Sequence, residues 1–323
     1  MGKLVVEWLR ALSFGGGFNT NVVLCAAILL GVAAGTVGVF SMLRKESLVA
    51  DAFAHASLAG VAAAFLVRGA LAAEGSAPRS MEILLLGAGI SGSLAVAAIG
   101  WLTRRTRLTA DTATAAVSSA SFGLGICLLS VAHRAGGAGQ AGLDLLVFGS
   151  AASMTRADAW TMGVLAVLTL TVTLVAAKPL TAIAFSDRYA RTTGLRVPAM
   201  EALLAALVAA VTLAGMQAVG MLLIVALLVI PPATARLWVR RVPPLLALSA
   251  SLGGLSAWAG TSLSAAAPNA PTGALIVLTA SALFVVSLAA APERGIVAGL
   301  SRRARLRRDA RAAAIRAREV RGA

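Results

Sequence analysis

The sequence predicts an all-α integral membrane protein, a polytopic helix bundle of about nine spans. Hydrophobic residues make up 59% of the 323 residues and charged residues only 13%, with a mean hydropathy of +0.89. This is far more apolar than a soluble domain of the same length. Apolar stretches of about 20 residues recur along the chain, and a helix of that length crosses roughly 30 Å of hydrocarbon. Lys and Arg lie mostly between and after these stretches.

The apolar stretches can be assigned to spans in chain order. The first stretch is too long for the apolar region of a cleaved signal peptide, so it is the first span. The break between the sixth and seventh stretches, Gly215–Gly220, is short, and counts of eight or ten are also compatible with the pattern. The nine predicted spans are 20–43, 48–67, 82–102, 112–132, 159–177, 199–215, 218–238, 243–262 and 272–291.

The distribution of positive charge predicts the orientation of the spans. If Arg44 and Lys45 are cytoplasmic, alternation places 22 of the 28 Lys and Arg residues on the cytoplasmic side and six on the other. Without the C-terminal tail the ratio is still twelve to six. Positive residues are enriched in cytoplasmic loops, so the N-terminus is predicted outside and the C-terminus in the cytoplasm.

Two segments are predicted not to span. Leu143–Ser150, in the external segment 135–158, is long enough only for a short re-entrant or interfacial helix, which needs protein to cover its backbone. In the cytoplasmic segment 186–198, Ser186 or Asp187 can cap a short helix that Gly194 ends. That helix is either a docking element or a plain connector.

The net charge of +15 does not indicate a nucleic-acid-binding protein. The basic residues lack interleaved aromatic residues, and the chain has one Tyr. The arginine-rich tail 298–323 is predicted to be cytoplasmic, either as an interfacial helix on anionic membrane lipid or as a solvated extension. No nucleic-acid partner is expected.

The most informative polar residues are Asp51 and His55, inside the second predicted span. An ionisable residue within a span is costly unless it faces a cavity or a partner. The spacing of four puts both side chains on one helical face. Carboxylate oxygen and imidazole nitrogen are half of a ligand set for Mn, Zn or Fe(II). A structural hydrogen-bonded pair is the alternative interpretation.

Two further features bear on function. Pro231 and Pro232 interrupt the seventh predicted span and would bend it, either as architecture or as part of a gate. The chain has no glycine-rich phosphate loop of the Walker type, so it is not expected to bind ATP by that route or to be an enzyme.

Several blocks of sequence resemble the zinc/manganese/iron-type family of ABC importer permeases. SLVADAFAHASLAG at Ser47–Gly60 is similar to that family's second-helix pattern GDALSHAxLPG. Ala50 and Ala59 stand where the pattern has Gly and Pro, and Pro232 stands where the family has Ala. The other matching blocks, in order, are LLVFGS (145–150), DRYARTTGL (187–195), AVGMLLIVALLVIPPATARL (218–237) and PTGALIVLTASALFVVSLAAAPERG (271–295).

The resemblance implies a fold like that of type II ABC importer permeases, with a transmembrane permease domain at 1–297 in the plasma (inner) membrane. It implies a homodimer, two cytoplasmic ATPase subunits and an extracytoplasmic metal-binding protein. Asp51 and His55 would line the metal pathway. Asp187, Ala190 and Gly194 would belong to the helix that couples to the ATPase. No permanently bound cofactor is expected, only the transported divalent metal ion, Mn, Zn or Fe.

Two other functions remain open from the sequence. One is a permease of the same architecture for a metal chelate such as a siderophore or cobalamin, which would not need a narrow Asp/His constriction. The other is a proton-coupled secondary carrier in which Asp51 and His55 relay protons.

Overall fold

The structure is a computed structural model that describes residues 18–71, 81–134, 156–218, 220–266 and 271–291. Within these ranges every regular element is an α-helix, so the predicted fold class is confirmed. A helix satisfies its backbone hydrogen bonds internally, which the hydrocarbon layer requires. The helices are α2 (Phe18–Leu43), α3 (Ser47–Leu71), α4 (Met81–Arg105), α5 (Ala110–Arg134), α7 (Arg156–Val175), α8 (Ala177–Phe185), α9 (Asp187–Thr192), α10 (Val197–Ala218), α11 (Met221–Trp238), α12 (Val242–Ala266) and α13 (Thr272–Ala290).

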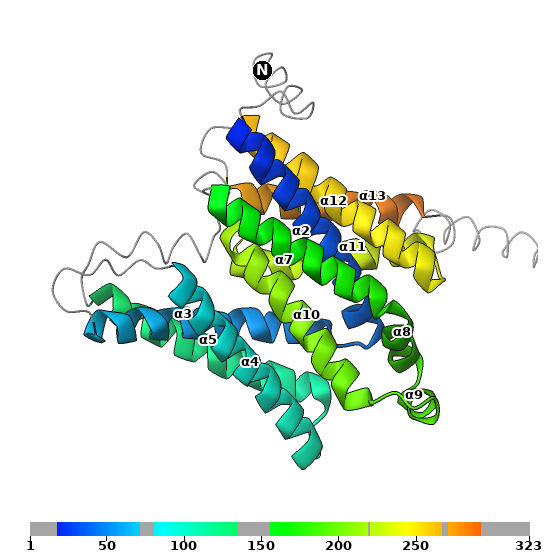
Figure 1. The fold of residues 1–323 in the computed structure, drawn as a ribbon, viewed down its shortest axis with the longest axis horizontal. Helices are drawn as coiled ribbons and strands as arrows, with labels where there is room; N and C mark the ends of the chain where they lie inside the picture. The colour runs from blue at the N-terminus through cyan, green and yellow to red at the C-terminus, as the bar shows by residue number, and fades with distance from the viewer. Residues whose placement is uncertain (1–17, 72–80, 135–155, 219, 267–270, 292–323) are drawn as a thin grey trace, which may run out of the picture.

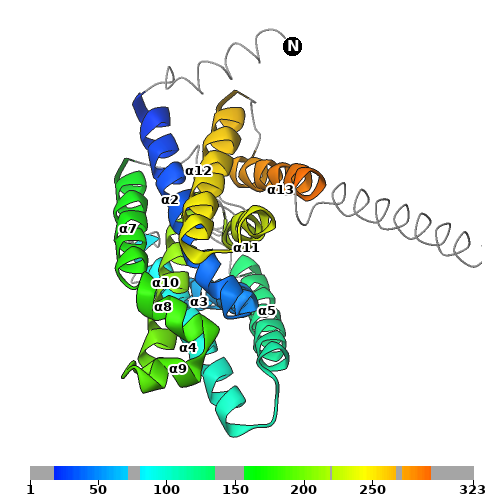
Figure 2. The same cartoon turned by 90° about the vertical axis from the view of Figure 1, so that its right-hand side faces the viewer.

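The helices form two packed groups (Figure 1). One contains α3, α4 and α5, with α3 packed against both of the others. The second is built around α2, which packs against α7, α10, α11 and α12, while α13 packs on α11 and α12. In Figure 2, α2, α7 and α12 run in a similar direction and α11 and α13 cross it. Helices α10 and α11 join the groups, because each also contacts α3.

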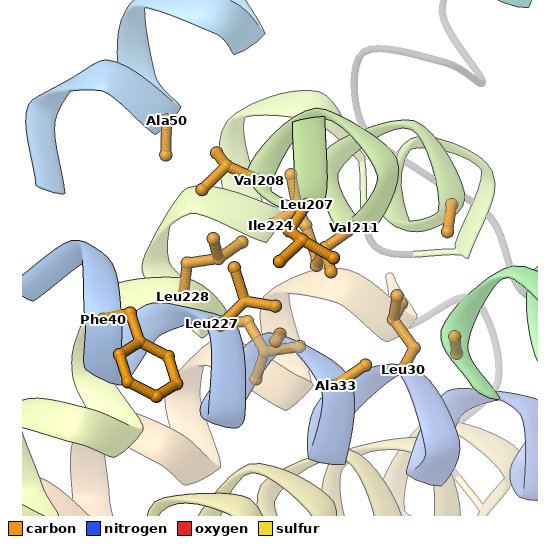
Figure 3. Close-up of a cluster of buried hydrophobic side chains, with 14 of the residues drawn as sticks. Leu30, Ala33, Phe40, Ala50, Leu207, Val208, Val211, Ile224, Leu227 and Leu228 are labelled. Atoms are coloured by element: carbon orange, nitrogen blue, oxygen red, sulfur yellow. The ribbon is translucent and has the colours of Figure 1, made fainter. Parts of the chain in front are cut away.

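The main hydrophobic core lies within the second group and reaches the start of α3 at Ala50. Figure 3 shows Phe40 of α2, Ala50 of α3, Val208 of α10 and Leu228 of α11 directed into a shared interior. These side chains are at most 3% exposed. The start of α3 is therefore held by packing from three other helices.

Small residues allow α2 and α12 to pack backbone to backbone. A Cβ atom added to Gly31 would collide with the carbonyl of Gly253, and one added to Gly253 would collide with the carbonyl of Gly31. One turn along, the Ser249 hydroxyl donates a hydrogen bond of 2.7 Å to the Gly35 carbonyl. Close approach at small residues is a common way to pack helices in membranes.

The predicted count of nine spans is not confirmed. Among the described residues, seven helices are long and apolar enough to cross a membrane. Helices α7 and α8 meet at a bend of 63° and make an eighth span if they are counted together. The apolar part of α11, Ile224–Trp238, is shorter than these. Every predicted span nevertheless coincides with a helix.

Two predicted segments, Leu143–Ser150 and the tail 298–323, lie outside the described residues. The predicted short helix in the segment 186–198 is confirmed as α9.

The structure gathers the basic segments that the sequence predicts to be cytoplasmic. Arg44 pairs with Asp187 and Glu201, and Arg104 pairs with Glu201 at 3.6 Å. A small apolar cluster joins the end of α2 to the end of α11 and the start of α12. Four of the five predicted cytoplasmic segments therefore lie at one end of the bundle: 44–45, 104–107, 178–196 and 236–241.

Candidate functional site

Helix α3 places Asp51 and His55 one turn apart on one face, as their spacing predicts. Their closest atoms, Asp51 Oδ1 and His55 Nε2, are 3.4 Å apart. That is longer than a typical N–H···O hydrogen bond. Two ligand atoms that each lie about 2.1 Å from a tetrahedral metal ion are separated by roughly the same distance. The pair therefore has the spacing of two ligands of one ion.

Helix α5 packs beside the pair, and two of its residues, one turn apart, each contact one member of the pair. The Ser118 hydroxyl donates a hydrogen bond of 3.2 Å to Asp51 Oδ2. One turn further along α5, Phe122 meets the His55 ring edge to face, with ring centroids 4.8 Å apart and an interplanar angle of 68°. Ser118 fixes the carboxylate so that Oδ1 faces His55, and Phe122 limits rotation of the imidazole.

The sequence pattern does not indicate a role for Ser118 or Phe122. They share the spacing of four with Asp51 and His55, but Ser and Phe at that spacing carry no signal of their own. Only the packing of α5 against α3 reveals their role.

The pair is open on one side. The Asp51 side chain is 39% exposed and that of His55 is 19% exposed. His55 Nδ1 is buried and has no hydrogen-bond partner. A ligating histidine commonly uses its second nitrogen to hold its ring in place. Here the ring is held by packing instead, and the carboxylate stays accessible to an ion.

One chain supplies an incomplete ligand set. No group of three or more His, Cys, Asp or Glu side chains lies close enough to hold a metal ion in the described part of the chain. Structural zinc sites have four protein ligands. Two ligands with open positions suit an ion that must bind briefly and leave.

The second set of predicted site residues lies on and after α9. The Ser186 side chain caps the helix by accepting a 3.2 Å hydrogen bond from the Tyr189 backbone N–H. Gly194 follows with φ of +80°, a left-handed conformation that favours glycine. The side chain of Asp187 is half-exposed, and Gly194 is exposed. Ala190 is fully buried, so it packs α9 onto the bundle.

Pro231 and Pro232 lie buried inside α11, which continues through both. The expected interruption of this span is therefore not seen. A proline at 232 leaves the Leu228 carbonyl without its helical donor. Gly38 of α2 packs directly on that carbonyl, where a side chain would collide. The role of Pro231 and Pro232 in a gate stays a prediction.

Comparison with known proteins gives consistent matches. The sequence model described as "ABC 3 transport family" matches residues 19–291. The manganese transport system membrane protein MntC of Bacillus subtilis is 38% identical over 90% of this chain, and the match spans only 65% of that relative's length. The zinc transport system membrane protein TroC of Treponema pallidum is 35% identical over 88% of this chain and 93% of its own length.

Two solved structures share the fold. PsaBC from Streptococcus pneumoniae in complex with Fab matches with a TM-score of 0.74 and 30% identity, over 90% of this chain and 97% of that chain. An inward-facing conformation of a putative metal-chelate type ABC transporter matches with a TM-score of 0.62 over 88% of this chain and 95% of that chain. Its identity is 16%, so it bears on the fold alone.

Proposed function

We propose that this chain, which belongs to the ABC 3 transport family, is the membrane-spanning permease subunit of an ATP-driven importer for a divalent transition-metal ion. The observation that carries the proposal is the Asp51–His55 pair, whose Oδ1 and Nε2 atoms are 3.4 Å apart and whose carboxylate is partly exposed. Relatives named as manganese and zinc transport proteins support the same substrate class. The chain itself would hydrolyse no ATP.

The pair would act as a transient ligand set. A carboxylate oxygen and a neutral imidazole nitrogen both suit Mn, Zn and Fe(II), whereas a magnesium site would consist of oxygen atoms. Hydrogen bonding by Ser118 keeps the Asp51 carboxylate oriented before the ion arrives. Because an ion held by two side chains keeps open positions, it can be passed on as the transporter alternates between outward- and inward-facing states.

The ligand set would be completed by a second copy of the chain. The Asp51–His55 pair is partly exposed in one chain, and a homodimer in which the two pairs face each other would bring four ligands together. Four ligands satisfy the usual coordination of zinc. An extracytoplasmic metal-binding protein would deliver the ion, and the membrane would be the plasma (inner) membrane.

The basic end of the bundle would face the cytoplasm. The segments gathered there hold most of the Lys and Arg residues within the permease domain, which agrees with the positive-inside rule. The C-terminus would then be cytoplasmic and the N-terminus outside. Helix α9 lies at this end and would dock on a cytoplasmic ATPase subunit through its exposed residues, including Asp187, with Gly194 beside them and Ala190 fixing the helix from behind. Pro231 and Pro232 would belong to the gate.

The test is uptake by proteoliposomes that contain the chain with its ATPase subunit. We expect Mn²⁺ or Zn²⁺ uptake that requires ATP hydrolysis. Uptake of a metal chelate but of no free ion would instead favour a chelate permease of the same architecture. Uptake by the chain alone, driven by a pH gradient without nucleotide, would favour a proton-coupled carrier.

Ser118→Ala should weaken ion binding without abolishing transport. It removes the hydroxyl that orients Asp51, and losing such a supporting hydrogen bond typically lowers metal affinity by about 10- to 100-fold. We expect the KM for the ion to rise by about tenfold, with a smaller change in the maximal rate. Ser119→Ala is the matched control, because Ser119 is exposed on the same helix. Equal KM values for the two variants would contradict this role.

A further inference from the structure

We propose that Arg44 is a positioning residue that ties α9 to the start of α3, so that a displacement of α9 reaches the Asp51–His55 pair. The inference rests on the proposed function, because it assigns α9 to the contact with the ATPase. It adds a residue, outside both the metal pair and α9, through which ATP hydrolysis acts on the ion.

Arg44 joins four segments of the chain with one side chain. It lies between α2 and α3, and its side chain is only 9% exposed. Nε bonds Glu46 Oε1 at 3.0 Å, and Nη2 bonds Glu201 Oε1 of α10 at 2.7 Å. Nη1 bonds both the Ile183 carbonyl of α8 and Asp187 Oδ1 of α9, each at 3.3 Å. The planar guanidinium of arginine is suited to several bonds of fixed direction.

The three carboxylates depend on Arg44 to stay together. Burial raises the pKa of Glu46, and the negative charges of Glu201 and Asp187 raise it further, against the lowering effect of Arg44. Burial by itself lowers the pKa of Arg44, but its three acidic partners raise it overall, so Arg44 remains charged. Without that charge the acidic groups would repel one another. Arg104 pairs with Glu201 at 3.6 Å and is largely exposed.

The connection from Arg44 to Asp51 contains a tightly bonded turn. Lys45 adopts a left-handed backbone with φ of 61°, a conformation that non-glycine residues rarely hold unless the surroundings impose it. The Glu46 N–H bonds the Ser41 carbonyl at 2.9 Å, and the Ser41 hydroxyl bonds the Glu46 carbonyl at 3.1 Å. Helix α3 begins at the next residue, Ser47, and Asp51 follows one turn later.

Helix α9 itself packs mainly on α8 and α10. The ion pair between Asp187 and Arg44 therefore links α9 directly to the turn 44–46, which precedes α3. If α9 moves with an ATPase subunit, the Asp187–Arg44 ion pair would displace the turn 44–46. That turn would move the start of α3, the helix that carries Asp51 and His55. Coupling of this kind needs a continuous set of packed or bonded groups.

The experiment compares Arg44→Gln with Arg104→Gln in the chain reconstituted with its ATPase subunit. It measures ATP hydrolysis and Mn²⁺ or Zn²⁺ uptake in the same vesicles. We expect Arg44→Gln to lower the number of ions transported per ATP by about fivefold, a size typical of residues on a coupling route. Arg104→Gln should leave this ratio unchanged. A residue with only a structural role would reduce the amount of assembled transporter but not the ratio.

Asp187→Asn is the second variant in case Arg44→Gln does not assemble. It weakens the link to α9 and leaves Arg44 paired with Glu46 and Glu201. We expect the same fall in ions per ATP, and no further fall when both substitutions are combined. A wild-type ratio in Arg44→Gln, or in Asp187→Asn if only that variant assembles, would overturn the inference. Absence of metal uptake by the wild-type complex would instead overturn the proposed function.

Discussion

Replacing Asp51 or His55 with Ala is expected to lower Mn²⁺ and Zn²⁺ uptake by at least about a hundredfold, because supporting residues alone contribute 10- to 100-fold to metal affinity. Each substitution removes one of the two ligands that a chain supplies. In a homodimer each would remove two of the four ligands at once. The measurement is ATP-dependent uptake of each ion by proteoliposomes containing the chain and its ATPase subunit.

Two variants separate loss of a ligand from loss of structure. Asp51→Asn keeps the shape of the side chain and can still accept the hydrogen bond from Ser118, but it removes the negative charge that attracts the ion, so it should be as inactive as Asp51→Ala. Asp111→Ala removes an exposed carboxylate from the start of α5 and should transport normally. If Asp51→Ala and His55→Ala transport at the wild-type rate, the assignment of the metal site is wrong.

Gly253→Ala is expected to lower the stability of the protein by a clear margin. The added Cβ would collide with the Gly31 carbonyl. Gly253 and Gly31 lie in the middle of long helices, so neither backbone can move away by itself. Extra methyl groups in a packed interior typically cost about 1–3 kcal/mol. The measurement is the thermal unfolding midpoint of the purified protein in detergent, which should fall.

Gly163→Ala on α7 is the matched control. Gly163 is also a helical glycine, but a Cβ there would meet nothing within 4 Å. Alanine is favoured over glycine in a helix by about 1 kcal/mol, so this variant should unfold at the same or a higher temperature. The two substitutions add the same methyl group, and only Gly253→Ala should lower the unfolding midpoint. A lower midpoint in Gly163→Ala than in Gly253→Ala would contradict the backbone contact between α2 and α12.

The sequence predicts the two candidate metal ligands but not the residues of α5 that contact them. The Asp51–His55 pair follows from a spacing within one helix, and spacing within a helix translates directly into geometry. The cap at Ser186 and the turn at Gly194 are local as well. Ser118 and Phe122 lie 67 residues or more from the partners they contact. Nothing in their own neighbourhood distinguishes them from other Ser and Phe residues in this chain.

The tertiary structure has three features that the sequence pattern does not show. The seventh predicted span continues through Pro231 and Pro232 as one helix, α11, which packs against α2, α12 and α13. The predicted count of nine spans is not confirmed, because α7 meets α8 at a sharp bend and the apolar part of α11 is short. Ala190, which the resemblance assigns to the helix that couples to the ATPase, is buried in the chain's own core. Hydropathy along a chain reports none of these, because it does not describe packing between helices.

The sequence by itself determined that this protein crosses a membrane repeatedly and that a carboxylate and an imidazole share a face of one helix. Both properties arise from the length, hydropathy and periodicity of a single helix. Only the tertiary structure decided which helix packs beside that pair, and which buried arginine joins the start of its helix to α9. Such contacts connect residues far apart in the chain, so they depend on how the helices pack against each other.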